Sequence, residues 1–174
     1  MDRDGVINKR LQDRYVASWE QFEFNEGVIE SIVKFNKFFK YIVVVTNQQG
    51  VGKQVMTEET LHDIHKKMLK TIEDAGGRID KVYYCSGLAL DNPKCRKPNT
   101  GMADQATLDF VGIDLKNAVM VGDSVCDMGF GINCGMRTVF LEDNPDEVDK
   151  SWDYDIDFRF RDLKEFAKYI AQKE

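Results

Sequence analysis

Four short polar segments of this sequence contain residue types that could carry chemistry. They read DRDGVIN over residues 2–8, TNQQG over 46–50, RKPNTGM over 96–102 and GDSVCDM over 122–128. Two of them, TNQQG and GDSVCDM, come directly after the apolar runs YIVVV and AVMV. Bringing carboxylates such as Asp2, Asp4 and Asp123 together costs free energy unless a cation neutralises them. Stability alone does not explain these segments, which indicate a site where carboxylates share a cation.

Strands that alternate with helices must position these segments. Continuous apolar runs rich in β-branched residues predict buried strands. The expected strands cover 41–46, 80–85 and 118–122, and two more could cover 137–141 and 154–160. The expected helices cover 28–39, 58–75, 101–111, 125–134 and 161–172. This alternation predicts an α/β fold, a three-layer, doubly wound and mostly parallel sheet of Rossmann-like type, in which ligands bind beyond the carboxyl ends of the strands.

Composition narrows the class of protein. The 174 residues suit one domain over 1–174, and 43% hydrophobic residues suit a soluble globular protein. The net charge of −6 disfavours nucleic acid and anionic membrane as partners. No apolar run approaches the ~20 residues of a membrane span, and no signal-peptide pattern is present. Four cysteines are too few for a disulfide scaffold, so we expect a reduced, cytoplasmic setting.

Taken together, the four segments resemble the motifs of the haloacid dehalogenase superfamily of phosphohydrolases. They are most similar to the branch containing D-glycero-D-manno-heptose 1,7-bisphosphate phosphatase and histidinol-phosphate phosphatase. The motifs occur in order, and the resemblance covers essentially the whole chain. It implies a Mg²⁺-dependent phosphomonoesterase that forms an aspartyl-phosphate and removes the 7-phosphate of a heptose bisphosphate, a small sugar phosphate.

Other functions stay open beside this one. Histidinol phosphate is the alternative substrate, and a non-catalytic pseudoenzyme that binds a phosphorylated ligand is the alternative class. A polynucleotide-end phosphatase shares part of the motif set, but the net charge of −6 argues against it.

The resemblance assigns the reacting groups residue by residue. Asp2 would be the nucleophile, and Asp4 would be the general acid and base. Asp2, the backbone carbonyl of Asp4 and Asp123 would hold Mg²⁺, an ion that prefers oxygen ligands. Asp127 lies one helical turn after Asp123 and would support the same site, although a surface or indirect role is also open for it.

Five further polar residues are assigned to the substrate. Thr46 and the backbone amide of Asn47 would hold the phosphate. Lys97 would neutralise charge on the transferring phosphoryl group, where positioning and electrostatics supply most of the catalysis. Arg96 and Lys53 are candidates for the remote part of the substrate, and a solvated role is the alternative for Lys53.

One departure from the family concerns zinc. Many members of the branch bind a structural Zn²⁺ in a loop that here reads CSGLALDNPKC. Cys85 and Cys95 match two of the ligand positions, while Gly87 and Pro93 stand at the other two. Two thiolates cannot complete a tetrahedral site, so we expect no structural zinc.

The remaining residues of metal-binding type lack partners in the sequence. Cys126 and Cys134 belong to a different predicted helix, and we expect all the cysteines to be free thiols. His62 and His65 stand three residues apart on a predicted surface helix without a third ligand. We expect both histidines to be solvated or to cap the helix.

The second departure lies at the N-terminus. In the family an apolar strand precedes the nucleophile and runs through the centre of the sheet, but only Met1 precedes Asp2 here. We expect that this first strand is missing from the sequence because the natural chain starts earlier; the alternative is a pseudoenzyme that has lost its centre.

Short insertions define the expected substrate site. No segment between the motifs is long enough for a cap domain, so we expect a capless, open site. We also expect the protein to be a monomer. Substrate choice would then depend on the loops over residues 9–25, 48–56 and 86–96.

Overall fold

Two small parallel sheets form the centre of the protein in the computed structural model, which describes residues 1–12, 14–143 and 145–173. The strands are β1 (Val43–Asn47), β2 (Lys81–Cys85), β3 (Val119–Gly122), β4 (Arg137–Leu141) and β5 (Phe158–Phe160). One sheet pairs β1 with β2, and the other has the order β3-β4-β5. All of these pairings are parallel, which confirms the predicted α/β class.

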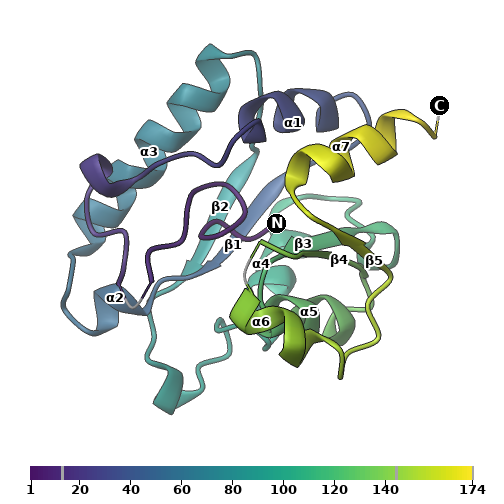
Figure 1. Cartoon of the computed structure of the whole chain (residues 1–174). Helices are drawn as coiled ribbons and strands as arrows, with labels where there is room; N and C mark the ends of the chain where they lie inside the picture. The colour runs from purple at the N-terminus through teal and green to yellow at the C-terminus, as the bar shows by residue number, and fades with distance from the viewer. Residues whose placement is uncertain (13, 144, 174) are drawn as a thin grey trace.

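Helices cover both faces of the sheets (Figure 1). They are α1 (Val28–Phe35), α2 (Gln49–Gly52), α3 (Glu58–Asp74), α4 (Gly101–Asp109), α5 (Val125–Asn133), α6 (Pro145–Ser151) and α7 (Leu163–Ala171). Short 3₁₀ turns occur at η1 (Trp19–Gln21), η2 (Ala89–Asp91) and η3 (Leu115–Asn117). No helix in these described ranges has the length and apolar character needed to cross a bilayer.

Two hydrophobic cores lie on opposite faces of the sheets. Val44 and Val121 belong to the core shared with α1, α3 and α7, whereas Val45 and Met120 belong to the core shared with α4 and α5. Neighbouring strand residues reach different cores because successive side chains of a strand point to opposite faces. Burial on both faces explains why these strands read as continuous apolar runs.

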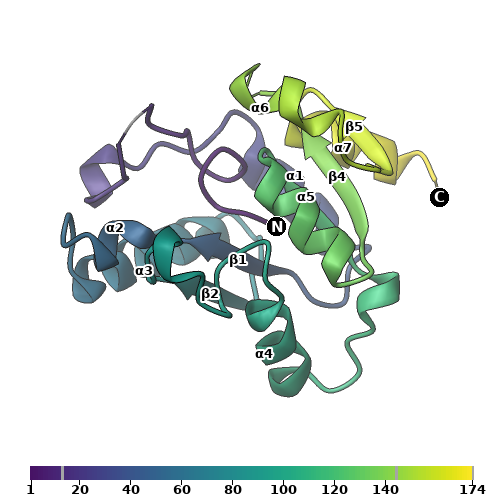
Figure 2. The ribbon, with the colours of Figure 1, turned by 90° about the horizontal axis from the view of Figure 1, so that it is seen from below.

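The first two residues connect the two sheets. The Met1 ammonium donates a hydrogen bond to the Val43 carbonyl at 2.9 Å, and the Met1 carbonyl accepts one from the Val45 amide at 2.9 Å. On the other side, the Asp2 amide donates to the Val121 carbonyl at 2.9 Å. Figure 2 shows the N-terminus between the two sets of strands. These bonds fix Asp2 at the carboxyl ends of both β1 and β3.

An apolar cavity of about 410 Å³ lies beside the seam that Met1 and Asp2 form between the two sheets. It is lined by Met1 and by residues of β1 and β3, including Val43 and Val119. Within the described residues, β1 and β3 do not pair with each other directly.

Some predicted elements differ from the structure. The predicted strand over 154–160 is paired only over Phe158–Phe160, because the Asp157 carboxylate accepts bonds from the Thr138 amide at 2.8 Å and hydroxyl at 3.0 Å. Helices α2 and α6 were not predicted. The sequence PDEVDKS of α6 has no apolar periodicity that could have signalled it.

Candidate active site

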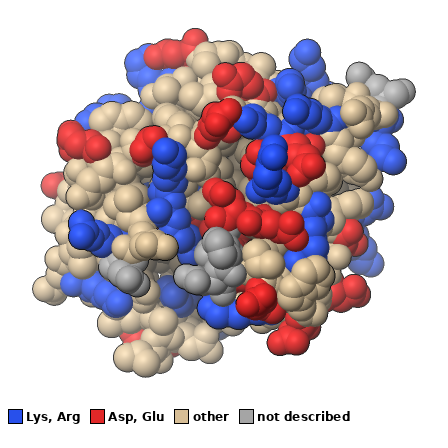
Figure 3. Space-filling model, viewed as in Figure 1, with Lys and Arg blue, Asp and Glu red and all other residues tan. Residues whose placement is uncertain are grey.

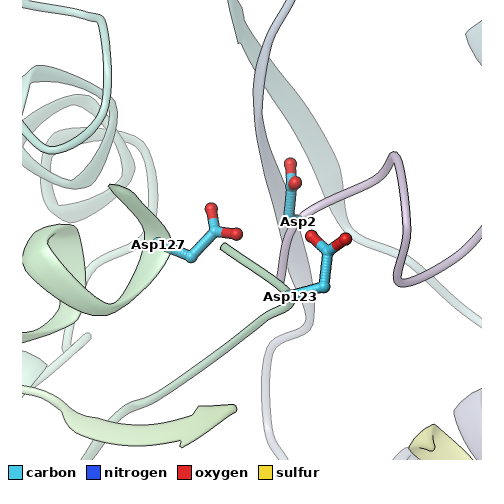
Figure 4. A group of neighbouring side chains, drawn as sticks. All are labelled: Asp2, Asp123 and Asp127. Atoms are coloured by element: carbon cyan, nitrogen blue, oxygen red, sulfur yellow. The ribbon is translucent and has the colours of Figure 1, made fainter. Parts of the chain in front are cut away.

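Three carboxylates meet at the carboxyl ends of the central strands. Asp2 lies at the seam between the sheets, Asp123 follows β3 directly, and Asp127 lies in the first turn of α5. Each offers an oxygen within 4.8 Å of the others (Figure 4). Within the described ranges this is the only group of three or more Asp, Glu, His or Cys residues that could hold a metal ion. The residues predicted from two separate motifs, DRDGVIN and GDSVCDM, therefore meet in space.

Lys97 lies between two of these carboxylates. Its ammonium is 2.8 Å from an Asp2 oxygen and 2.5 Å from an Asp127 oxygen. Burial lowers the pKa of Lys97, but Asp127 and Asp2 raise it by more, so the side chain stays charged. The Asn47 side chain fixes the backbone of Lys97, since it accepts from the Lys97 amide at 3.0 Å and donates to its carbonyl at 3.2 Å.

Asp127 holds Lys97 and caps a helix at the same time. One of its oxygens pairs with Lys97, and the other accepts bonds from the Ser124 hydroxyl at 2.6 Å and the Ser124 amide at 3.2 Å. Ser124 is the N-cap of α5. Both oxygens of Asp127 are therefore engaged, which favours a role in positioning Lys97.

The site is short of positive charge. Burial, followed by the Asp127 carboxylate, raises the pKa of Asp2. Burial also raises the pKa of Asp123 well above its usual range; Arg10 opposes this shift, while Asp127 and Asp2 add to it. The buried Oδ1 of Asp2 has the Lys97 ammonium at 2.8 Å as its ion-pair partner and makes no further hydrogen bond within the described structure. A buried set of carboxylate oxygens, in which the pKa values of two members are raised, fits a hard divalent cation such as Mg²⁺.

Arg10 contacts the same site from the loop after the first motif. Its Nη2 lies 2.8 Å from Asp123 Oδ1 and 3.3 Å from the backbone carbonyl of Asp4. No pattern in the sequence signals this contact, because the two side chains that pair are 113 residues apart.

Asp4 lies in a network of donors. Arg3 donates to both of its oxygens, at 2.8 and 2.9 Å, Asn8 donates at 2.9 Å and Gln48 donates at 2.7 Å. Burial raises the pKa of Asp4, but Arg3 and the other donors lower it by more, so the net shift is downward. The structure therefore holds Asp4 as a carboxylate. Sequence reasoning gave no role to Arg3 or Gln48, although both lie inside quoted motifs.

The prediction that His65 is solvated or caps its helix is wrong. His65 is 6% exposed, and its Nε2 lies 3.1 Å from Arg3 Nη1. Arginine can only donate, so Nε2 accepts and the ring is neutral. Burial and then the Arg3 charge lower the pKa of His65 to about 3. His62 is exposed and contacts the Tyr84 hydroxyl at 2.8 Å.

The other predicted substrate residues lie near the carboxylates in different settings. Thr46 is buried, and its hydroxyl accepts a bond from Gln48 at 2.9 Å. Arg96 lines the cleft, and its buried Nη1 makes no hydrogen bond within the described structure. Lys53 also lines the cleft, with its ammonium 5.5 Å from the centre of the Tyr15 ring.

An open cleft of about 1400 Å³ leads to the carboxylates. Figure 3 shows acidic side chains at the centre of this face, with basic side chains around them. The basic residues that line the cleft include Lys9, Arg10, Arg14, Lys53, Arg96 and Lys97. A cleft with this rim attracts an anionic ligand toward a site that requires a cation.

The expectation that all the cysteines are free thiols is wrong for two of them. Cys85 and Cys95 form a disulfide, with their Cα atoms 5.4 Å apart. The bridge closes the loop that precedes Arg96 and Lys97. Cys126 and Cys134 are free, as expected.

Comparisons with known proteins give a consistent result. A family model described as polynucleotide kinase 3 phosphatase matches residues 2–167. The D-glycero-alpha-D-manno-heptose-1,7-bisphosphate 7-phosphatase of Campylobacter jejuni is 34% identical over 100% of this chain and 95% of its own length. The corresponding enzyme of Helicobacter pylori, named for the beta anomer, is 30% identical over 98% of this chain and 94% of its own length.

A solved structure shares the fold. The D,D-heptose 1,7-bisphosphate phosphatase from B. bronchiseptica, complexed with magnesium and phosphate, superposes with a TM-score of 0.91 at 26% identity, covering 99% of this chain and 97% of that one. The parallel α/β fold and the comparisons define a phosphatase of the haloacid dehalogenase type. The chain belongs to the matched phosphatase family, in the branch of that superfamily that contains the heptose 1,7-bisphosphate 7-phosphatases.

Proposed function

We propose that the protein is a Mg²⁺-dependent phosphatase that removes the 7-phosphate of D-glycero-D-manno-heptose 1,7-bisphosphate. The observation that carries this proposal is the cluster of Asp2, Asp123, Asp127 and Lys97 at the end of an open, basic-rimmed cleft. The names of the relatives and the magnesium and phosphate bound to the B. bronchiseptica enzyme support it.

Asp2, the backbone carbonyl of Asp4 and Asp123 would hold the Mg²⁺ ion. When bound, the ion would reduce the repulsion between an anionic nucleophile and an anionic phosphate. The raised pKa values of Asp2 and Asp123 support this assignment, because a cation favours the charged form of both groups.

Asp2 would act as the nucleophile, and Asp4 would transfer the protons. An Asp2 oxygen attacks the phosphorus, the P–O bond to the sugar breaks, and the leaving oxygen takes a proton from the Asp4 carboxyl group. Asp4 then takes a proton from water, whose oxygen attacks phosphorus and releases Asp2 and phosphate. The ionised form of Asp4 suits the second step. For the first step, Asp4 must turn away from Arg3 and take up a proton.

Lys97 would stabilise the negative charge that the phosphoryl oxygens carry during transfer. Thr46 and the backbone amide of Asn47 would orient the phosphate at the same end of β1. Arg96 and Lys53 would bind the remote part of the substrate, and the buried Arg96 Nη1 without a hydrogen bond supports this role for Arg96.

Phosphate release tests this proposal. The α and β anomers of the heptose bisphosphate, histidinol phosphate and an oligonucleotide with a 3′-phosphate would each be supplied with and without Mg²⁺. We expect preferential release from a heptose bisphosphate and loss of release with a chelator. Asp2→Asn should abolish turnover, while Asp74→Asn, on the exposed end of α3 beside Lys70, should not change it.

Each other outcome has a distinct meaning. Preferential release from histidinol phosphate or from the oligonucleotide would replace the proposed substrate. No release from any substrate, with Mg²⁺ and phosphate still binding, would identify a pseudoenzyme. Full activity of Asp2→Asn would refute the assignment of the nucleophile.

A further inference from the structure

We propose that Arg10 is an internal cation that holds the metal site in the metal-free protein and leaves when Mg²⁺ binds. This inference rests on the proposed function, since it requires that Mg²⁺ is the cation of this site. The Arg10 guanidinium contacts Asp123 Oδ1 at 2.8 Å and the Asp4 carbonyl at 3.3 Å. These two groups are the ones that we assign to Mg²⁺ together with Asp2.

The charges around Arg10 explain why it lies there. Asp123, Asp2, Asp127 and Asp4 all act on the guanidinium, in that order of strength. Lys97 supplies positive charge to Asp2 and Asp127 but forms no ion pair with Asp123 within the described structure. The charge of Asp123 is therefore balanced by Arg10, its partner in a salt bridge.

The burial of the two partners indicates which one can move. The Asp123 side chain is 2% exposed, whereas the Arg10 side chain is 41% exposed and lines the open cleft. Arg10 lies in an irregular loop, outside any helix or strand. Its long side chain can therefore swing into the cleft while Asp123 stays in place.

A guanidinium and Mg²⁺ cannot both contact Asp123 and the Asp4 carbonyl, because they would occupy the same position and repel each other. Binding of the ion then exchanges one cation for another. The displaced Arg10 remains in the cleft, where the anionic substrate must enter.

Mg²⁺ titration by calorimetry, without substrate, tests the exchange. Arg10→Gln should bind Mg²⁺ roughly tenfold more tightly than the wild type, a difference of about 1.4 kcal/mol, because no ion pair has to break. Arg10→Lys keeps the charge but loses the planar fork, so we expect an intermediate affinity. Lys9→Gln is the matched control: it removes the same charge from the same cleft, but Lys9 is paired with Glu23. Its affinity should stay within about twofold of the wild type.

Thermal unfolding gives a second measurement. In a chelator, Arg10→Gln should have a lower Tm than both the wild type and Lys9→Gln, because Asp123 loses its partner. Mg²⁺ should raise the Tm of Arg10→Gln by more than that of the wild type.

The outcomes separate this inference from the proposed function. Equal or weaker Mg²⁺ binding by Arg10→Gln, with normal binding by the wild type, would overturn the role of Arg10 and leave the function intact. An equal gain in affinity in Lys9→Gln would also overturn it, since general electrostatics would then suffice. Failure of every chain to bind Mg²⁺ would refute the metal site itself.

Discussion

Gly5 is the position where a single methyl group would disturb the site most directly. Its φ is +93°, and a Cβ built on it would lie 2.0 Å from Asp123 Oδ2. The carboxylate would have to move by about 1 Å to reach even the 3.0 Å separation below which real Cβ contacts essentially never occur. Gly5→Ala therefore combines an unfavourable backbone conformation with displacement of Asp123.

Gly112 provides a matched control for the backbone effect. Its φ is +89°, and a Cβ there would meet nothing within 4 Å. Both substitutions should cost about 1–2 kcal/mol of stability from the left-handed conformation alone. Only Gly5→Ala should also impair catalysis, because a misplacement of about 1 Å at a reacting centre can cost about 100-fold in rate.

Denaturant unfolding, kcat/KM for phosphate release and Mg²⁺ affinity would be measured for both variants. We expect Gly112→Ala to keep the activity of the wild type, and Gly5→Ala to lose about 100-fold in kcat/KM and to bind Mg²⁺ more weakly. A Gly5→Ala protein that matches Gly112→Ala in all three measurements would refute the argument that Gly5 makes room for Asp123.

Asp127→Asn removes the charge that pairs with buried Lys97. We expect this variant to lose about 2 kcal/mol in unfolding free energy and at least roughly tenfold in kcat. An unchanged kcat would show that Lys97 needs no such partner. The pKa of His65 falls from 6.5 to about 3 on folding, so the unfolded chain binds more protons between these values. The stability that neutral His65 contributes is complete above pH 6.5 and is about 1.4 kcal/mol lower one pH unit below that value. In urea unfolding, the free energy of unfolding of His65→Asn should therefore change less between pH 6.5 and pH 5 than that of the wild type. A reductant should open the Cys85–Cys95 bridge, whose sequence separation is 10, and lower the free energy of unfolding by about 2–3 kcal/mol. A Cys85→Ser variant whose stability still falls on adding reductant would contradict this.

The sequence predicted the central architecture because burial on both faces leaves a strong signal. Strands such as Val43–Asn47 and Val119–Gly122 are continuous apolar runs, and the polar residues after them end at one edge of the sheet. Asp123 lies at this edge for this reason. The resemblance to the phosphohydrolase motifs, and not the order of elements alone, predicted that Asp2 and Lys97 lie beside it.

Contacts between distant side chains carried no such signal. The position of His65 in its predicted helix does not indicate that it contacts Arg3, because the two residues are 62 positions apart and meet only through the packing of α3 against the N-terminal segment. The bridge between Cys85 and Cys95 depends on how their loop folds back. Arg10 likewise reaches Asp123 from a loop 113 residues earlier in the chain.

The seam at Met1 and Asp2 gives the site a mechanical role. The hydrogen-bonded sheets on its two sides are separate: Met1 bonds to β1, and Asp2 bonds to β3, which leads directly into Asp123. Relative motion of the two sheets therefore acts on the short segment that carries Asp2. A ligand held by both Asp2 and Asp123 would fix this segment against β3, so backbone amides far from the cleft should exchange with solvent more slowly once the site is filled.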